Sequence, residues 1–232
     1  FQRQTSILAG QGPKALAKAD FDGDGWIDVV VLDSASALHL LRGHRGGSFQ
    51  KTQRICEEDA VEAIASGDLN GDGLADLVLT GPKGTRVLAG DGRGGVLSKP
   101  LAQLQESGVA ILIADWTGDG IADLMLLHPD KDRASFLAGI AQGGFTPRGE
   151  LRFADRVSAM TAADFDLDGI TDLAVARGES HLVTIFRGRG DLQFERGGDF
   201  AAGGIPIALD TTAGDEQGPH PVVRLAGSTE AV

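Results

Sequence analysis

Four short segments of the chain place oxygen-bearing side chains at one repeated spacing. Each has the pattern Asp-x-(Asp/Asn/Thr)-x-Asp-Gly-x-x-Asp, and we name them loops 1 to 4: residues 20–28, 68–76, 115–123 and 164–172. Hard oxygen ligands on a tight loop suit Ca²⁺, which takes 6–8 oxygens, and glycine at position 6 allows the sharp turn. The spacing therefore predicts about four Ca²⁺ ions, one in each loop.

The predicted ligands of each loop are the side chains at positions 1, 3, 5 and 9 and the backbone carbonyl at position 7. Loop by loop they are Asp20, Asp22, Asp24, Trp26, Asp28; Asp68, Asn70, Asp72, Leu74, Asp76; Asp115, Thr117, Asp119, Ile121, Asp123; and Asp164, Asp166, Asp168, Ile170, Asp172. An EF-hand would have a bidentate Glu at position 12. The residues there are apolar, so the Asp at position 9 must replace that Glu.

The four loops differ in charge. Loops 1 and 4 carry four carboxylates each, whereas position 3 is neutral in loops 2 and 3. The carboxylate count predicts tighter binding by loops 1 and 4, although Leu167 replaces a glycine in loop 4 and is expected to strain its turn. The alternative is a set of Asp/Gly turns that only cap hairpins. Four carboxylates in nine residues repel one another without a cation, which favours the metal.

The elements that must hold these loops follow from the repeat. The loops begin 48, 47 and 49 residues apart, and a marker residue lies 19 positions before each: Phe1, Phe49, Val96 and Phe145. Phe194 is a further marker, whose loop at 213–221 has lost most acidic positions and is predicted to be metal-free. We therefore expect one domain of residues 1–232 with repeats starting near 1, 49, 96, 145 and 194.

Each repeat reads as four short strands separated by Gly/Asp turns. First strands are expected at 14–19, 61–67, 109–114 and 157–163, second strands at 27–32, 74–80, 121–127 and 170–176, third strands at 37–42, 86–89, 135–138 and 182–187, and fourth strands from the marker residues. Four strands per ~48 residues are typical of a propeller blade. The prediction is an all-β fold, a β-propeller of about five four-stranded antiparallel blades, with residues 1–8 completing the degenerate fifth.

These repeats resemble FG-GAP/VCBS repeats, the calcium-loop blades of integrin-α-type propellers, through the Asp-rich loops and their Phe and Gly markers. The resemblance covers residues 1–213. It implies a β-propeller, Ca²⁺ held between the first and second strands, and an extracellular or cell-surface location. Typical members have seven blades, which differs from the count expected here.

Composition, charge and the missing motifs argue against several other classes of function. The 232 residues carry a net charge of −12, which argues against binding nucleic acid because a phosphate backbone demands a basic face. No apolar run approaches the ~18 residues of a membrane helix. One cysteine, Cys56, excludes an intramolecular disulfide framework. The five histidines have no metal-protease spacing, and no nucleophile motif is present, so we expect a protein that is not an enzyme.

Two sets of charged residues lie outside the loops. Arg42, Arg86 and Arg187 are placed at repeated strand ends, where salt links to nearby Asp residues are expected. The tripeptide 189–191, Arg-Gly-Asp, spells an adhesion motif but aligns with plain glycine turns of other repeats. It predicts a hairpin turn rather than an adhesion site.

The leading interpretation is a secreted or cell-surface, calcium-binding structural or interaction module of the adhesion type. One alternative is a self-assembling filament or surface-layer subunit, in which a neighbouring copy supplies the strand that the fifth blade lacks. Others are a carbohydrate-binding lectin with pockets between blades and the non-catalytic propeller of a larger enzyme. The sequence does not name the protein or glycan ligand.

Overall fold

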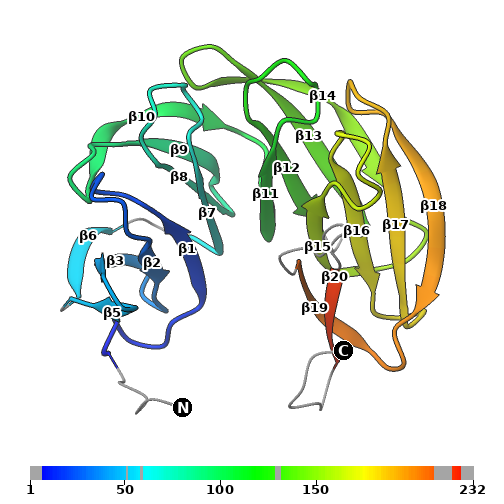
Figure 1. Ribbon diagram of the computed structural model, residues 1–232, viewed down its shortest axis with the longest axis horizontal. Coiled ribbons are helices and arrows are strands. Elements are labelled where there is room, and N and C mark those ends of the chain that lie inside the picture. Colours follow the sequence, from blue (N-terminus) through cyan, green and yellow to red (C-terminus); the bar gives the residue numbers. More distant parts are fainter. Residues whose placement is uncertain (1–6, 51, 58–59, 129–131, 212–220, 226–232) are drawn as a thin grey trace. The chain divides into compact units, whose positions relative to one another are not determined.

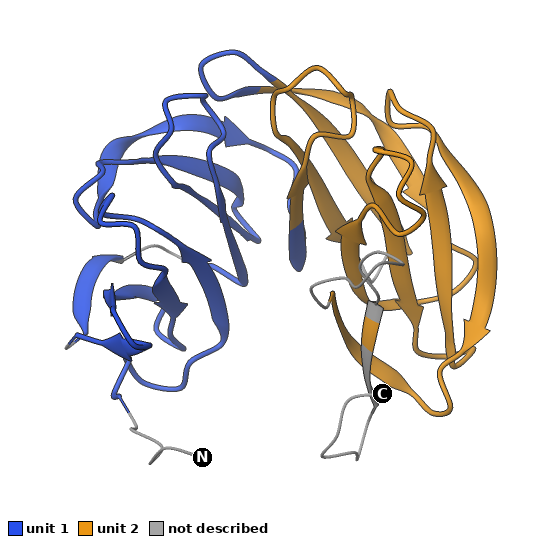
Figure 2. Cartoon of the chain, in the orientation of Figure 1, with its two compact units in different colours: residues 1–111, 140–144 blue, residues 112–139, 145–232 orange. Residues whose placement is uncertain are grey.

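The computed structural model describes residues 7–50, 52–57, 60–128, 132–211 and 221–225, and strands are its only regular elements there (Figure 1). The chain divides into two compact units (Figure 2). Unit 1 comprises residues 1–111 and 140–144, and unit 2 comprises residues 112–139 and 145–232. The single domain expected over residues 1–232 stays a prediction.

Unit 1 contains two four-stranded sheets and a short ribbon. The first sheet has the order β1 (Ala15–Ala19), β2 (Asp28–Leu32), β3 (Ala37–Leu41) and β6 (Gln53–Glu57), the ribbon pairs β4 (Gly43–His44) with β5 (Ser48–Phe49), and the second sheet has β7 (Ala63–Gly67), β8 (Asp76–Gly81), β9 (Gly84–Gly90) and β10 (Val96–Leu104). Neighbouring strands are antiparallel in both sheets. This is the hairpin-to-hairpin order expected of a propeller blade.

The remaining strands repeat this order. The third sheet, most of which lies in unit 2, has β11 (Ala110–Ala114), β12 (Asp123–His128), β13 (Arg133–Ile140) and β14 (Gly144–Arg152); the fourth has β15 (Val157–Ala163), β16 (Asp172–Arg177), β17 (Leu182–Gly188) and β18 (Phe194–Ala201); and β19 (Pro206–Thr211) pairs with β20 (Pro221–Leu225). The expected fifth blade therefore has two strands among the described residues. Of the eight residues expected to complete it, 1–6 lie outside the described part, and Ile7 and Leu8 are not in a strand.

The second strand of each sheet forms the centre of the core. Every residue of β8, β12 and β16 is buried, as expected for strands covered on both faces. In unit 1, Leu32, Leu38 and Leu40 of the first sheet share one apolar cluster with Leu77 and Leu79 of the second. The apolar runs that follow each Asp-rich loop are therefore what anchors that loop to the core.

In the first sheet, the fourth strand differs from the boundaries that the repeat predicts. The repeat predicts that Phe49 opens a continuous strand, but the strand is split into β5 and β6. Phe49 keeps the marker's register, because it pairs with Gly43 as Phe194 pairs with Gly188. The pairing then shifts by one residue before Gln53, which lies opposite Leu40. An extra residue of this kind is a β-bulge; the pairing of β18 with β17 has the same shift without a break, so the interruption is particular to the first sheet.

A buried carboxylate organises the turn between β2 and β3. Asp33 Oδ1 accepts hydrogen bonds from the N–H groups of Ala35 (2.9 Å) and Ala37 (3.0 Å), and Oδ2 lies 2.9 Å from His39 Nε2. The contact with His39 and these backbone donors hold the pKa of Asp33 at about 2. A depressed pKa means that this carboxylate stabilises the fold above its usual pKa of ~4 and that the stabilisation is lost as the pH falls toward 2.

We therefore expect Asp33→Asn to lower the melting temperature at pH 7. The difference from the unmodified protein should shrink as thermal melts are repeated from pH 4 down to pH 2, because protonation of Asp33 removes from the unmodified protein the charged interaction that the variant already lacks. Asp210→Asn, at an exposed position, serves as the control and should leave the melting temperature nearly unchanged. A deficit of Asp33→Asn that is constant down to pH 2 would contradict this assignment.

Candidate metal centre

The four Asp-rich loops connect the first and second strands of the four sheets, where the family resemblance places them. In each loop the Asp at position 1 folds the chain around its own carboxylate. In loop 1, Asp20 accepts hydrogen bonds from the N–H groups of Gly23 (2.7 Å), Asp24 (3.2 Å) and Gly25 (2.8 Å). In loop 3, Asp115 accepts from the same three loop positions, whereas among the described residues Asp68 of loop 2 accepts only from positions 4 and 6 and Asp164 of loop 4 only from positions 5 and 6.

Positions 5 and 7 form a second small turn. The carboxylates at position 5 accept the N–H of position 7 at 2.8–2.9 Å in all four loops: Asp24 from Trp26, Asp72 from Leu74, Asp119 from Ile121 and Asp168 from Ile170. One turn conformation is thus built four times. The role of the position-7 carbonyls as ligands stays a prediction.

Position 9 has a structural role that the spacing alone does not reveal. Its carboxylates are almost fully buried: Asp28, Asp76, Asp123 and Asp172. In loop 1, Asp28 Oδ2 accepts the N–H of Phe21 (3.0 Å) and Oδ1 accepts the N–H of Gly43 (2.7 Å), which lies in β4, two residues beyond the end of the third strand β3. The other three loops repeat both bonds. This Asp therefore ties the loop to the third strand of its own sheet.

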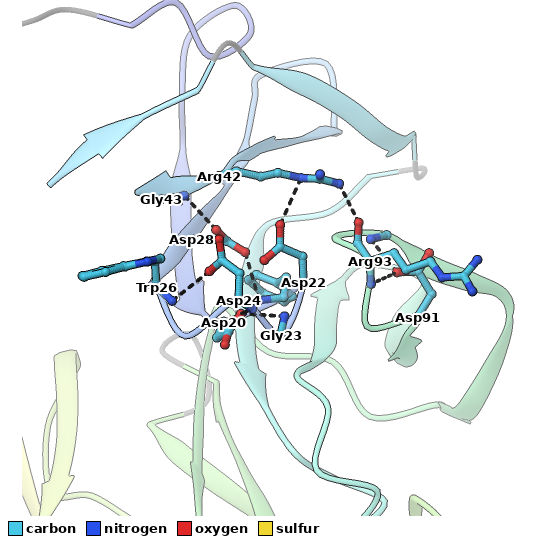
Figure 3. Close-up of polar contacts among 12 residues, drawn as sticks. Asp20, Asp22, Gly23, Asp24, Trp26, Asp28, Arg42, Gly43, Asp91 and Arg93 are labelled. Atoms are coloured by element: carbon cyan, nitrogen blue, oxygen red, sulfur yellow. Dashed lines mark hydrogen bonds and ion pairs between the residues drawn. The ribbon is translucent and has the colours of Figure 1, made fainter. Parts of the chain in front are cut away.

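Position 3 distinguishes the loops. In loop 1 the carboxylates of Asp20, Asp22 and Asp28 offer oxygens within 4.8 Å of one another, and in loop 4 the equivalent three residues do the same. Arg42 Nε lies 3.4 Å from Asp22 Oδ2 (Figure 3), and Arg187 Nε lies 3.6 Å from Asp166 Oδ2. These are the salt links expected from the sequence. Arg86 does not share this position, because it lies four residues before Gly90, whereas Arg42 and Arg187 directly precede Gly43 and Gly188.

The electrostatics of loop 1 favour a cation. Burial raises the pKa of Asp22, and the neighbouring Asp28 and Asp24 carboxylates raise it further, while Arg42 acts in the opposite direction. Burial also raises the pKa values of Asp76 and Asp172. Carboxylates whose charged form is disfavoured by burial and by like charges gain most from a positive ion among them.

The oxygens of loop 1 also fit a metal ion by their hydrogen bonding. Asp22 Oδ1 is buried without a hydrogen-bond partner among the described residues. Two carboxylate oxygens have about four lone-pair sites, and Asp20 and Asp28 each use three or fewer of them for N–H donors. These residues therefore keep free acceptor sites around the loop, and a buried acceptor left without a partner is costly.

Loops 1 and 3 also contact the next sheet of the same unit. In unit 1, Gly94 in the β9–β10 turn donates its N–H to the carbonyl of Phe21 at position 2 of loop 1 (2.9 Å). In unit 2, Leu192 in the β17–β18 turn donates to the carbonyl of Trp116 at the same position of loop 3 (3.3 Å). The conformation of a loop is thereby linked to the packing of its neighbour.

Loop 4 carries the strain expected at Leu167. This residue has φ of 60°, while the glycines at the same position of the other loops have φ of 74–78°. A left-handed conformation costs a residue with a side chain roughly 1–2 kcal/mol. Leu167 is 57% exposed, so little apolar burial compensates that cost.

We expect Leu167→Gly to stabilise the protein by about 1 kcal/mol, measured by urea denaturation. The matched control is Gly118→Leu in loop 3, where an added Cβ meets nothing within 4 Å, so backbone strain alone should destabilise it by a similar amount. Effects of the same sign in both variants would show that the backbone conformation is not the cause.

A pocket of about 340 Å³ lies in unit 2, outside the loops. Arg148 Nη2 and Asp191 Oδ1 form an ion pair of 2.8 Å at its wall, and Phe136 and Phe194 stack with centroids 5.5 Å apart. Asp191 belongs to the Arg-Gly-Asp tripeptide, whose Arg189 pairs with Glu195. No sequence pattern indicated this pocket, because its ion pair joins residues 43 positions apart.

The comparisons with known proteins agree with the architecture. A family model described as FG-GAP-like repeat matches residues 20–79, 68–126 and 115–175. No match was found among curated proteins. Nowhere in the described part of the chain is there a helix with the length and apolar character that crossing a membrane requires.

Two solved structures are similar in fold. One is a lectin from Agrocybe aegerita, described by its specific recognition of non-reducing terminal N-acetylglucosamine, with 16% identity and a TM-score of 0.61; the match covers 89% of this chain and 59% of the lectin. The other is BBS1N in complex with ARL6DN, with 11% identity, a TM-score of 0.54 and coverage of 94% and 78%. The expected all-β propeller fold is confirmed.

Proposed function

Because the chain belongs to the FG-GAP-like repeat family, we propose that it is a calcium-binding β-propeller that acts as an extracellular or cell-surface interaction module. The proposal is carried by the grouping of Asp20, Asp22 and Asp28, whose oxygens lie within 4.8 Å of one another around a buried acceptor without a partner among the described residues. FG-GAP repeats are typically calcium-binding, and commonly extracellular. The proposed role is binding rather than catalysis.

Calcium would be held by the side chains at positions 1, 3, 5 and 9 of each loop and by the carbonyl at position 7. When bound, the ion would neutralise the carboxylates and fix the loop. The protein's own residues already supply the turn: Asp20 gathers three N–H groups, and Asp28 joins the loop to Gly43, just beyond the third strand. Because loops 1 and 3 contact the turns of neighbouring sheets, fixing either loop stabilises the packing between its sheet and the next.

Calorimetric titration of the chelator-treated protein with Ca²⁺ tests this proposal. About four ions per chain are expected, with dissociation constants of ~10⁻⁴–10⁻³ M, as for other extracellular modules. Mg²⁺ should bind far more weakly, because it demands an octahedral shell and sheds water reluctantly. No heat on addition of millimolar Ca²⁺, together with an unchanged melting temperature, would refute the calcium site.

A second candidate function is carbohydrate binding, favoured by the pocket in unit 2. Ligand pockets of ~300–1,000 Å³ combine apolar walls with a few placed polar groups, and this pocket combines Phe136 and Phe194 with Arg148 and Asp191. The fold is also that of a lectin, but at 16% identity no binding residue of the lectin is assigned to this chain. A glycan array should show a signal that Arg148→Ala abolishes and Arg152→Ala, at an exposed position outside the pocket lining, retains. An empty array, or equal signals from both variants, would reject this candidate.

A further inference from the structure

Two positions vary together among the four repeats of this chain. One is loop position 3, and the other is the residue directly before the glycine that donates to the Asp at position 9, within or just after the third strand. In the order of the loops the two residues are Asp22 with Arg42, Asn70 with Ala89, Thr117 with Ala138, and Asp166 with Arg187. An arginine is present where position 3 is an acid, and an alanine is present where it is neutral.

The structure shows that the acid and the arginine are in contact. Each arginine places its Nε against its acid, at 3.4 Å for Asp22 and 3.6 Å for Asp166. The pair in loop 1 is well covered, with the Asp22 side chain 14% exposed and the Arg42 side chain 32% exposed. Arg42 also donates from Nη2 to the carbonyl of Arg93 in the next sheet of unit 1 (2.5 Å; Figure 3).

The arginines equalise the charge of the four loops. Loops 1 and 4 have four carboxylates and one arginine, which gives −3, and loops 2 and 3 have three carboxylates and no arginine, which also gives −3. Carboxylate count alone predicts that loops 1 and 4 bind calcium more tightly. The guanidinium removes that advantage, because it repels a divalent ion held by the same carboxylate.

We propose that Arg42 and Arg187 are affinity-setting residues of the calcium sites. Each offsets the extra acid of its loop, lowers the calcium affinity to that of a three-carboxylate loop, and holds the loop in place when no ion is bound. Asp22 has an oxygen for each partner: Oδ2 faces Arg42, and Oδ1 is buried without a partner among the described residues. This inference rests on the proposed calcium-binding function.

Loop 1 contains a tryptophan that can report metal binding by its fluorescence. The chain has two tryptophans, and Trp26 lies at position 7 of loop 1 with 43% exposure. Trp116→Phe leaves Trp26 alone, and it breaks no side-chain hydrogen bond of the described structure, because Trp116 Nε1 has no partner there. Luminescence of Tb³⁺ sensitised by Trp26, displaced by added Ca²⁺, then measures the affinity of loop 1 in the full chain.

Three variants in the Trp116→Phe background test the inference. Arg42→Ala should raise the calcium affinity of loop 1 about tenfold, and Asp22→Asn should lower it about tenfold. The double variant copies the Asn70–Ala89 combination of the second repeat and should return to within about threefold of the starting affinity. If Arg42→Ala folds poorly, Arg42→Gln replaces it in the experiment. This variant keeps a donor for the Arg93 carbonyl and should raise the calcium affinity of loop 1 in the same way.

Arg93→Ala is the matched control. It removes a nearby exposed guanidinium but keeps the backbone carbonyl that Arg42 contacts, so affinity should stay within about twofold. In EDTA, Arg42→Ala should melt below its parent, whereas Arg93→Ala should not. If neither the parent nor any variant binds Ca²⁺, the proposed function fails. If the parent binds but Arg42→Ala does not bind more tightly, or the double variant does not recover, the role of the arginines fails while the calcium sites stand.

Discussion

Chelation of calcium by EDTA is expected to lower the melting temperature of the protein sharply. With a dissociation constant of ~10⁻⁴ M and roughly millimolar free calcium, each site stabilises the native state by about 1.4 kcal/mol. Four independent sites would contribute about 6 kcal/mol, comparable with the ~5–15 kcal/mol that stabilises a whole domain. The metal-free protein would also retain the repulsion among the carboxylates of each loop.

The measurement is a thermal melt in EDTA, repeated after millimolar Ca²⁺ or Mg²⁺ is restored in excess of the chelator. Calcium should recover the melting temperature and magnesium should do so poorly. A potassium chloride control at matched ionic strength separates specific binding from screening of the −12 net charge. Three coincident melts would mean that the loops are only turns.

Removal of the buried Asp123 carboxylate is expected to destabilise the protein even without metal. This side chain is fully buried and accepts the N–H groups of Trp116 (2.8 Å), Thr117 (2.9 Å) and Gly139 (2.8 Å). Asp123→Ala leaves these donors without their acceptor and opens a polar cavity, which should cost about 3–5 kcal/mol in total. Urea denaturation in EDTA measures this loss with no contribution from calcium.

Asp119→Ala in the same loop is the matched control. Asp119 is exposed, and its carboxylate accepts the N–H of Ile121. In EDTA it should lose less than about 1 kcal/mol, whereas in calcium it should lose its share of the metal-dependent stabilisation as well. If both variants are equally stable in EDTA, the Asp at position 9 is only a metal ligand. Asp123→Asn, which keeps one acceptor oxygen, covers the case in which Asp123→Ala does not fold.

The strands could be predicted from the sequence because their signals are local and repeated. The apolar run 124–127 follows its loop directly, and a period of ~48 residues places the next run without any knowledge of tertiary contacts. The same period places Phe49 in its correct register. The break between β5 and β6 could not be predicted, because whether pairing continues past residue 49 depends on the facing strand, which the marker does not describe.

The loops could be predicted as oxygen-rich turns, but the different structural roles of their carboxylates could not. The spacing predicts that the Asp at position 9 is one more ligand. Its structural role depends on the N–H groups that it accepts, and one of these belongs to Gly43, which lies 15 residues away on another strand. The effect of Arg42 on Asp22 is hidden for the same reason, since the pattern of a nine-residue loop does not contain the strand that faces it. In both cases the missing information is a contact between separate elements.

The bond between a loop carbonyl and the turn of the following sheet has a consequence for how such chains lengthen. The bond is made twice, between the loop carbonyl of Phe21 and the turn N–H of Gly94 and between those of Trp116 and Leu192. Both partners are backbone groups, so a tandem duplication of one ~48-residue segment supplies a new loop carbonyl and a new turn N–H together, whatever side chains it carries. Growth of an ancestral chain by whole segments therefore requires no new substitutions at the junctions between sheets. An insertion that is not a whole segment separates a loop carbonyl from its turn N–H.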